Sequence, residues 1–332
     1  MIVLKRITIL YSILVIGTCP SFVFAEDFRD YLKAVREKAI IAGVPERILN
    51  KEFNGLKPDP RVLELDRNQP EFVQTLADYL DARVSKARII KGQEMSSGFL
   101  EELSRVEEYY QVDSEYILAF WGLETNYGRY QGNYSVVRSL ATLGHDPRRK
   151  NFFTRELINA LKILDQGHIS SDQFVGAWAG AMGQSQFMPS SFLGYAQDFD
   201  RDGRKDIWNS EIDVFASIAY YLKKNGWKPG FGWGKKVIVS ETILKEFPPM
   251  VSQTKCRALK YHSKKMLLNG WRDLGVNTKG LLDEQAYALL RPGAEQGHTY
   301  LVGGNFETIL AYNCANKYAI SVGLLADFLS SN

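Results

Sequence analysis

The sequence has few cysteines, no marked excess of either charge and, after its first 25 residues, no long apolar run. Three cysteines occur in 332 residues, and only Cys256 and Cys314 follow residue 25. Two cysteines cannot form the disulfide framework on which small secreted domains depend. They can pair in a single bridge or remain two separate buried thiols, and the sequence leaves both alternatives open.

Positive charge barely exceeds negative charge. The chain has 41 lysines and arginines against 38 acidic residues, which gives a formal net charge of +3. Removing residues 1–25 takes away Lys5 and Arg6 and no acidic residue, so the net charge falls to +1. Proteins that bind nucleic acid usually carry a strongly basic face. The composition therefore gives no support to nucleic acid as a partner.

Residues 1–25 have the pattern of a secretory signal peptide. A short basic start is followed by an apolar stretch over residues 7–16 and by Val-Phe-Ala, a cleavage site before Glu26. The stretch is shorter than the roughly 18 apolar residues of a membrane span. We therefore expect a periplasmic protein. The alternative is a lipoprotein with its lipid on Cys19. We rank it second, because Ile-Gly-Thr matches poorly the residues expected before a lipidated cysteine.

Helical periodicity dominates the chain up to about residue 227. Apolar residues recur three and four positions apart over residues 27–40, 72–90, 152–167 and 213–227, with prolines between several of these segments. The stretch over residues 183–195 also has a helical pattern. These segments predict a mainly α protein.

A different pattern begins near Pro229. Residues 230–302 contain several glycines and prolines and two strand-like segments, KVIVS and TYLVGG, which predict a small β-containing region. After Asn305 we expect an apolar strand or turn, and then a final helix over roughly residues 316–329.

The stretch WGLETNYGRY places one glutamate at the end of an apolar run. Residues 116–123, YILAFWGL, have no polar face, which predicts a helix buried on all sides. Asp113 precedes this helix, and we expect its side chain to cap the helix N-terminus. Glu124 comes directly after the run, where a carboxylate is costly to desolvate.

Apolar neighbours would make Glu124 a candidate general acid. A single glutamate is more often solvated or salt-bridged. Phe120, Trp121 and Tyr127, however, can form an apolar wall around it. Desolvation raises the pKa of a carboxyl group and keeps it protonated near neutral pH. Lysozyme uses a glutamate in an apolar pocket in this way to protonate a glycosidic oxygen.

Four longer segments carry a family resemblance. The sequence LETNYGRYQGNYSVVRSLATLGHDPRRKNFFTREL is followed by AWAGAMGQSQFMPSSFLGYAQDFDRDGRKDIWN, by SIAYYLKKNGW and by NFETILAYNCANKYAISV. Together they cover roughly residues 100–230 and 303–325. In these segments the chain resembles the lytic murein transglycosylase B family.

The resemblance implies a lysozyme-like helical core in which Glu124 is the single catalytic acid and base. Enzymes of this family cut the β-1,4 bond between N-acetylmuramic acid and N-acetylglucosamine without water and leave a 1,6-anhydromuramic end. The glutamate first protonates the leaving oxygen. As a carboxylate it then takes the proton of the C6 hydroxyl group, which attacks C1 of the same sugar. No cofactor is expected for catalysis.

Other functions stay open at this point. A hydrolytic muramidase would need a second carboxylate about 5–9.5 Å from the first, and no candidate is obvious beside Glu124. A non-catalytic peptidoglycan-binding protein would keep the family's substrate-binding groove but would not cleave the glycan. A calcium-stabilised interaction protein is supported only by an acidic loop. The expected partner is the peptidoglycan glycan strand, and the sequence does not name any partner in cell-wall synthesis or division.

The resemblance also suggests which residues bind substrate. Arg148 and Arg149 would hold peptide carboxylates or lactyl groups. Without the resemblance, the favoured interpretation is that they are solvent-exposed residues at the start of a helix. Gln186 would bind an N-acetyl group of the glycan. The alternative is that it has only a structural role, in tight helix packing. The full set of expected substrate-binding residues is Asn126, Tyr127, Arg148, Arg149, Gln186, Phe187, Met188, Tyr221, Tyr312 and Tyr318.

The chain departs from the family pattern at Ala177. The family often has a serine there, which helps to order the acetamido group near the acid. Without that hydroxyl group, substrate orientation would fall to Gln186, Asn126 or a water molecule, and activity would be altered.

An acidic loop matches the first nine positions of an EF-hand calcium loop. Acids stand at positions 1, 3, 5 and 9 and the required glycine, Gly203, at position 6. Position 12 is Asn209 instead of the usual glutamate, so Asp213 is a candidate closing ligand. The alternative is an acidic turn neutralised by nearby basic residues. We expect structural Ca²⁺ held by Asp198, Asp200, Asp202, the carbonyl group of Arg204, Asp206 and Asp213.

These observations predict a mainly α (α+β) protein with a lysozyme-like helical core. The expected divisions are a signal peptide at 1–25, an N-terminal helical region at 26–100, the catalytic core with its EF-hand-like loop at 101–230, a small β-containing domain at 231–302, and a C-terminal segment at 303–332 that returns to the core.

Overall fold

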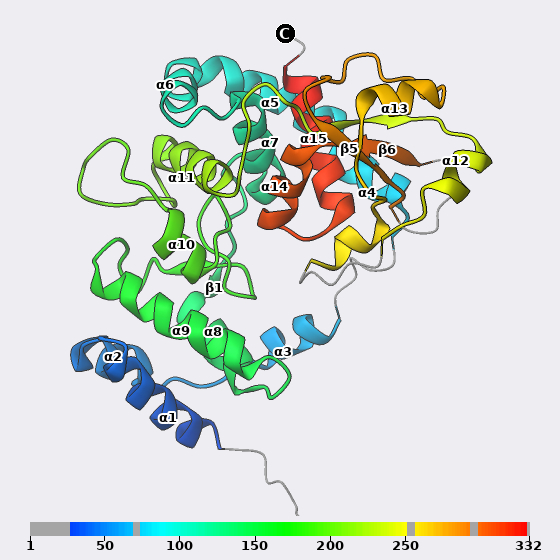
Figure 1. Ribbon diagram of the computed structural model, residues 1–332. Helices are drawn as coiled ribbons and strands as arrows, with labels where there is room; N and C mark the ends of the chain where they lie inside the picture. Colours follow the sequence, from blue (N-terminus) through cyan, green and yellow to red (C-terminus); the bar gives the residue numbers. More distant parts are fainter. Residues whose placement is uncertain (1–26, 69–73, 251–255, 293–297, 331–332) are drawn as a thin grey trace, which may run out of the picture.

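The computed structural model describes residues 27–68, 74–250, 256–292 and 298–330. They form a mainly helical molecule with a small sheet on one side (Figure 1), so the predicted fold class is confirmed. Among these residues, no helix combines the length and the apolar character that a membrane crossing requires. The predicted signal peptide and Cys19 lie outside the described residues.

The first six helices separate into two groups. Helices α1, α2 and α3 pack against α8 and α9, at the bottom of Figure 1, whereas α4, α5 and α6 pack around α7, α11 and α15. The six helices are α1 (Phe28–Ile41), α2 (Glu46–Phe53), α3 (Pro60–Arg67), α4 (Leu76–Arg83), α5 (Lys86–Gly98) and α6 (Leu100–Tyr110).

Helix α7 is the centre of the core. Its run from Tyr116 to Leu123 is buried at every position, which confirms the predicted helix without a polar face. The elements that follow it are α7 (Ser114–Thr125), β1 (Tyr134–Ser135), α8 (Val136–His145), α9 (Lys150–Asp165), β2 (Val175–Gly176), α10 (Pro189–Tyr195) and α11 (Glu211–Lys224). Strands β1 and β2 form a two-stranded antiparallel ribbon.

The predicted role of Asp113 was wrong. It stands at the N-cap position of α7, but its side chain makes no capping hydrogen bond. Its two carboxylate oxygens instead accept hydrogen bonds from the indole of Trp227 and from the amide of Gly230, both at 2.9 Å. Asp113 therefore ties the start of α7 to the chain that leaves α11.

The β-containing region is a four-stranded antiparallel sheet with strand order β3-β6-β5-β4. Successive residues of its strands point to opposite faces of the sheet, and each face packs against a different hydrophobic core. Leu289 and Leu301 pack in a small separate core with Trp271, whereas Leu290 and Val302 join the main core. The elements are β3 (Gly234–Val237), α12 (Glu241–Glu246), the 3-10 helix η2 (Arg257–Tyr261), β4 (Met266–Leu267), α13 (Leu268–Asp273), β5 (Ala286–Leu290) and β6 (Thr299–Val302). The domain boundaries stay a prediction.

The chain returns to the core through two helices, α14 (Gly304–Tyr312) and α15 (Asn316–Leu329). The predicted final helix is confirmed by α15. The strand or turn expected after Asn305 was wrong, because α14 occupies that segment. Phe306, Ile309 and Leu310 are its buried apolar residues, and their spacing of three and four positions is helical.

The segment at residues 183–195 is helical only in part. Helix α10 begins at Pro189, and the residues before it form a tight turn in which Met182 and Phe187 pair as an isolated bridge. Gly183 and Gln186 have left-handed backbone angles there, with φ of 63° and 50°. A side chain on Gly183 would collide with Ile207, which explains why the turn needs glycine.

The two cysteines left open by the sequence are joined. Cys256 and Cys314 form a disulfide bond, with their Cα atoms 5.5 Å apart. The bond connects the chain just before η2 to the loop between α14 and α15.

Candidate active site

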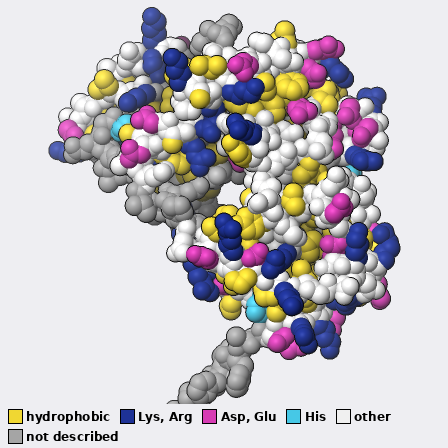
Figure 2. Space-filling view, turned by 180° about the vertical axis from the view of Figure 1, so that it is seen from behind, with side chains coloured by type: hydrophobic (Ala, Val, Ile, Leu, Met, Phe, Trp, Pro, Cys, Tyr) yellow, Lys and Arg dark blue, Asp and Glu magenta, His cyan; other side chains and the backbone are white. Residues whose placement is uncertain are grey.

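Glu124 lies at the C-terminal end of α7 and is half-buried in a pocket of about 200 Å³. The hydroxyl group of Tyr318, on α15, donates a hydrogen bond to its Oε1 atom at 2.5 Å. The described residues that line the pocket are Tyr79, Arg83, Leu123, Glu124, Asn313 and Tyr318. Glu124 is the only carboxylate among these described lining residues. Seen from behind, the molecular surface is hollowed between its two ends (Figure 2).

Two left-handed residues follow the end of α7, one residue after the glutamate. Asn126 and Tyr127 have φ angles of 53° and 59°, and their amides bond back to the carbonyl groups of Gly122 and Trp121. This is the pattern of a left-handed helix cap, which asparagine tolerates better than tyrosine. Tyr127 is held there because its hydroxyl group donates to the carbonyl oxygen of Arg88 at 3.0 Å. The structure thus places Tyr127, a predicted substrate-binding residue, in the interior.

Three of the predicted tyrosines are buried, and two of them, Tyr312 and Tyr318, lie within the electrostatic influence of Glu124. Burial raises the pKa of Tyr221 to about 12 and raises the pKa values of Tyr312 and Tyr318 well above the usual tyrosine range. The negative charge of Glu124 adds to the pKa shift of Tyr312 and Tyr318. A raised phenol pKa means that the neutral form is retained, so Tyr318 remains a hydrogen-bond donor at neutral pH.

The structure brings the predicted aromatic residues together in one cluster. The ring of Tyr312 lies 4.8 Å from that of Tyr221 and 5.7 Å from that of Phe187, measured between centroids. The hydroxyl group of Tyr312 donates to the carbonyl oxygen of Ser185 at 2.5 Å, and that of Tyr221 donates to the carbonyl oxygen of Ala311 at 2.6 Å. These bonds attach α14 to α11 and to the turn at residues 183–187.

Gln186 lies in the same turn, and Met188 follows it. The amide nitrogen of the Gln186 side chain donates to the carbonyl oxygens of Gln131 and Gly183 at 3.1 and 3.0 Å. Met188 is half-buried and precedes α10 at its N-cap position. Neither is among the residues that line the pocket of Glu124.

Gln184 is a site residue that the sequence did not single out. Its side chain is buried, accepts a hydrogen bond from the indole of Trp121 at 2.7 Å and donates to the carbonyl oxygen of Trp208 at 3.1 Å. Its backbone carbonyl accepts from the hydroxyl group of Thr125 at 3.0 Å. Gln184 thereby fixes the end of α7 against the turn and against the acidic loop.

Arg148 and Arg149 lie at the start of α9 and are paired within the protein. Both guanidinium groups bind the carboxylate of Asp66 on α3, whose side chain is 3% exposed. Arg148 also binds Asp146 at 3.1 Å and lowers the pKa of that carboxyl group, and Arg149 stacks on the ring of Phe153. The arginines are half-exposed, and neither lines the pocket of Glu124. Their peptide-binding role stays a prediction.

Ala177 follows the β1–β2 ribbon in a closely packed turn. Its amide donates to the carbonyl oxygen of Ala181 at 2.8 Å, and its carbonyl oxygen accepts from the amide of Gly180. A Cβ atom on Gly132 would stand 2.1 Å from the carbonyl oxygen of Gly176, so the chain at Gly132 has no room for a side chain.

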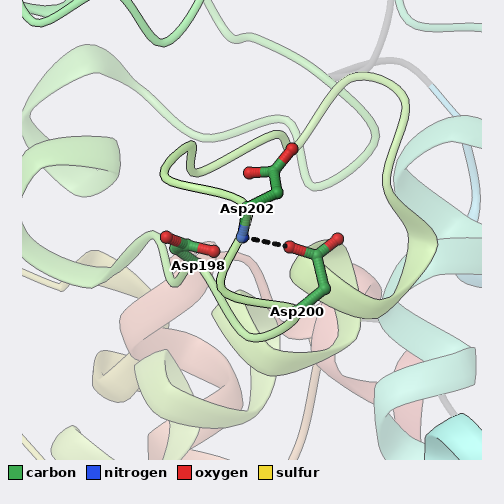
Figure 3. A group of neighbouring side chains, drawn as sticks. All are labelled: Asp198, Asp200 and Asp202. Atoms are coloured by element: carbon green, nitrogen blue, oxygen red, sulfur yellow. Dashed lines mark hydrogen bonds between the residues drawn. The ribbon is translucent and has the colours of Figure 1, made fainter.

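The acidic loop brings three carboxylates together. Oxygen atoms of Asp198, Asp200 and Asp202 lie within 4.8 Å of one another. Figure 3 shows the three side chains gathered at the loop. Backbone amides at residues 202–204 hold one oxygen of each carboxylate. The Oδ1 atom of Asp198 is buried and has no hydrogen-bond partner among the described residues. A buried orphan oxygen beside two more carboxylates fits a hard cation such as Ca²⁺.

Asp213 closes the loop through backbone amides. It is fully buried, and its two oxygens accept from the amides of Phe199 at 2.7 Å and Asp206 at 2.9 Å. Burial raises the pKa of its carboxyl group to about 6. Asp206 accepts from the amides of Trp208 and Asn209. The metal-binding roles of Asp206, Asp213 and the Arg204 carbonyl group stay predictions.

Comparison with known proteins places this chain in a family. A family model described as the transglycosylase SLT domain matches residues 27–327. The chain therefore belongs to the transglycosylase SLT domain family. It is 33% identical to the membrane-bound lytic murein transglycosylase B of Escherichia coli strain K12 over 222 residues, which are 66% of this chain. The alignment covers 58% of that relative, less than two thirds of its length.

Solved structures extend the similarity to most of the chain. SltB3 from Pseudomonas aeruginosa, in complex with NAG-anhNAM-pentapeptide, has a TM-score of 0.83 and 37% identity, and the match covers 92% of this chain and 80% of that one. An Escherichia coli lytic transglycosylase in complex with calcium has a TM-score of 0.74 and 26% identity, over 93% of this chain and 94% of that one.

Proposed function

We propose that this protein is a lytic transglycosylase that cleaves the β-1,4 bond between N-acetylmuramic acid and N-acetylglucosamine in peptidoglycan and leaves 1,6-anhydromuramic ends. The observation that carries the proposal is the half-buried carboxyl group of Glu124, held by Tyr318 in a pocket whose described lining residues include no other carboxylate. The complexes of SltB3 with NAG-anhNAM-pentapeptide and with NAG-NAM-pentapeptide support the substrate class.

In the first step Glu124 acts as a general acid. Its proton passes to the glycosidic oxygen as the bond to C1 of the muramoyl sugar breaks, and the N-acetylglucosamine part leaves as an alcohol. The hydrogen bond from Tyr318 fixes the orientation of the carboxyl group and favours its anionic product. Arg83 and Asn313, in the same pocket, can donate hydrogen bonds to acetamido and hydroxyl oxygens of the sugar.

In the second step the Glu124 carboxylate acts as a base. It takes the proton of the C6 hydroxyl group, whose oxygen attacks C1 of the same sugar and closes the anhydro ring. The nucleophile is already part of the substrate, so ring closure requires neither water nor a second carboxylate. The proton on Glu124 is thereby restored for the next cycle.

Product masses test the proposal. Digestion of purified peptidoglycan should release muropeptides lighter by one water than the corresponding hydrolysis products. Fragments with hydrated reducing ends would instead identify a hydrolytic muramidase. Such an enzyme would need a second carboxylate about 5–9.5 Å from Glu124. Binding to peptidoglycan without any product would identify a binding protein.

Structural calcium is a second part of the proposal. Asp198, Asp200 and Asp202 would hold the ion, which would relieve the repulsion between their charges and supply a partner for the orphan oxygen of Asp198. The calcium complex of the Escherichia coli relative supports the choice of ion. The ion would have no part in the reaction. It would fix the loop that follows α10 and contacts Gln184 through Trp208.

Calcium should therefore raise the thermal stability of the protein. At 100 times the dissociation constant, one bound ion adds about 2.7 kcal/mol, which corresponds to a rise in melting temperature of several degrees. A chelator should reverse the rise, and the Asp202→Asn variant should show little of it. Glu37→Gln, which removes an exposed acid from α1, is the matched control and should respond like the wild type. Equal melting curves with calcium and with chelator would exclude the site.

We also propose that the protein is exported. The basic and apolar pattern of residues 1–25 supports a signal peptide, and the substrate is located outside the cytoplasmic membrane. N-terminal sequencing of protein from the periplasmic fraction should begin at Glu26. A sequence that begins at Met1 would contradict cleavage.

A further inference from the structure

One short loop connects two tyrosines of the candidate site. Residues 313–315 join α14 to α15, so Tyr312 stands immediately before the loop and Tyr318 lies in the first turn of α15. The first loop residue, Asn313, lines the pocket of Glu124. The loop therefore lies between the pocket residue Asn313 and the helical turn that carries Tyr318.

The chain around η2 holds this loop by three links. The disulfide bond joins Cys256 to Cys314. The side-chain nitrogen of Asn316 donates to the carbonyl oxygen of Ala258 at 2.9 Å, and the Oδ1 atom of Asn316 lies 3.0 Å from the Nε2 atom of His262. Asn316 and His262 are 7% and 2% exposed. We call these five residues the η2 clasp.

Helix α15 begins without a capping side chain, although Lys317 in its first turn also bonds to the carbonyl oxygen of Gln74. Ala315 occupies the N-cap position and has no side chain that could accept a hydrogen bond from the helix amides. Both polar groups of the Asn316 side chain are used by the β-containing region. Two positions later, Tyr318 is the residue that donates to Glu124.

We propose that the η2 clasp is the positioning device of the active site, and that it holds Tyr318 in hydrogen-bonding contact with Glu124. The expected effect on turnover rests on the proposed function. The expected effect on the position of Tyr318 does not. Asn316, His262 and the disulfide are positioning residues, because they act on the carboxyl group only through Tyr318. The small β-containing region thereby contributes to catalysis without touching substrate.

A salt bridge on the same side of the molecule provides a matched control. Lys265, next to β4, pairs with Glu307 on α14 at 2.8 Å, and both side chains are partly exposed. It joins the same two parts of the chain as the clasp, but through α14 and not through a residue of the loop at 313–315. Lys265→Ala should therefore weaken the attachment of the β-containing region without moving Tyr318.

The first readout is independent of activity. In protein labelled with ¹³C at the tyrosine Cζ position, the Tyr318 resonance is identified as the one that disappears in Tyr318→Phe. It should shift in Asn316→Ala and in the double variant Cys256→Ser with Cys314→Ser, and it should stay in place in Lys265→Ala. An unchanged resonance in both clasp variants would overturn the inference, whether or not the protein cleaves peptidoglycan.

The second readout is the rate of muropeptide release. Misplacement of a catalytic group by about 1 Å costs roughly a hundredfold in rate, so the two clasp variants should lose roughly tenfold to a hundredfold in kcat with little change in KM. Lys265→Ala should keep the wild-type kcat. Equal kcat values in all three variants would also overturn the inference. If the wild type itself releases no product, the proposed function fails, and the tyrosine resonance still decides the positioning role.

Discussion

Replacing Glu124 with glutamine is expected to lower the rate of muropeptide release by about four orders of magnitude, the upper end of the range for a general acid–base residue. Glutamine has the same shape and can still accept the hydrogen bond from Tyr318. It cannot give a proton to the leaving oxygen or take one from the C6 hydroxyl group. Both steps of the proposed reaction therefore fail in one variant while the pocket keeps its geometry.

Glu115→Gln is the control for this prediction. Glu115 is a half-buried carboxylate in the first turn of the same helix, and burial raises its pKa. It does not line the pocket, so its replacement should leave the rate within a factor of about two, as expected for a side chain away from the reacting groups. Both variants should melt close to the wild type by circular dichroism. A Glu124→Gln protein with more than a tenth of the wild-type rate would contradict the assignment of Glu124.

The second large effect is expected at Gly323, in the middle of α15. A Cβ atom on this residue would stand 2.2 Å from the Cδ2 atom of Trp233 and 2.5 Å from two more atoms of the indole. The indole is almost fully buried and is held by hydrogen bonds from its Nε1 atom to Asp327. Because neither the ring nor the helix can move away, Gly323→Leu should lower the free energy of unfolding by about 3 kcal/mol or more.

Urea denaturation with Gly98→Leu as the control measures this effect. Gly98 is also a helical glycine, at the end of α5, and a Cβ atom there would meet nothing within 4 Å. Leucine is the better helix former by roughly 0.8 kcal/mol, so the control should be neutral or slightly stabilised. Similar unfolding midpoints for the two variants would show that α15 does not depend on this contact.

The local sequence pattern was sufficient to predict the buried helix that carries Glu124. The apolar residues 116–123 and the glutamate that follows them are neighbours in sequence, so burial and the position of the carboxylate could both be predicted from nine residues. The three aspartates of the acidic loop were likewise predicted from their spacing, which places them together by loop geometry alone.

Partners distant in sequence could not be predicted in this way. Asp66 binds both Arg148 and Arg149 from α3, and nothing in its surroundings marks it as buried. Tyr79 and Arg83 line the pocket from α4, where they read as ordinary residues of a surface helix. Asp113 had the pattern of a capping residue, but partners on the chain after α11 compete for its oxygens. Tertiary contacts outweighed local preference in each case.

Because the candidate site is built from α7 and α15, its two parts are synthesised at different times and come together late in folding. The two groups that form the hydrogen bond of the candidate site are Glu124, in the first half of the chain, and Tyr318, in the last helix. During synthesis the glutamate emerges long before the helix that must orient it, and contacts between residues this far apart form late in folding. A partly made or partly folded chain would thus carry the acid without the group that aligns it. For an enzyme with the proposed activity, completion of the fold would itself act as a safeguard against premature cutting of the cell wall.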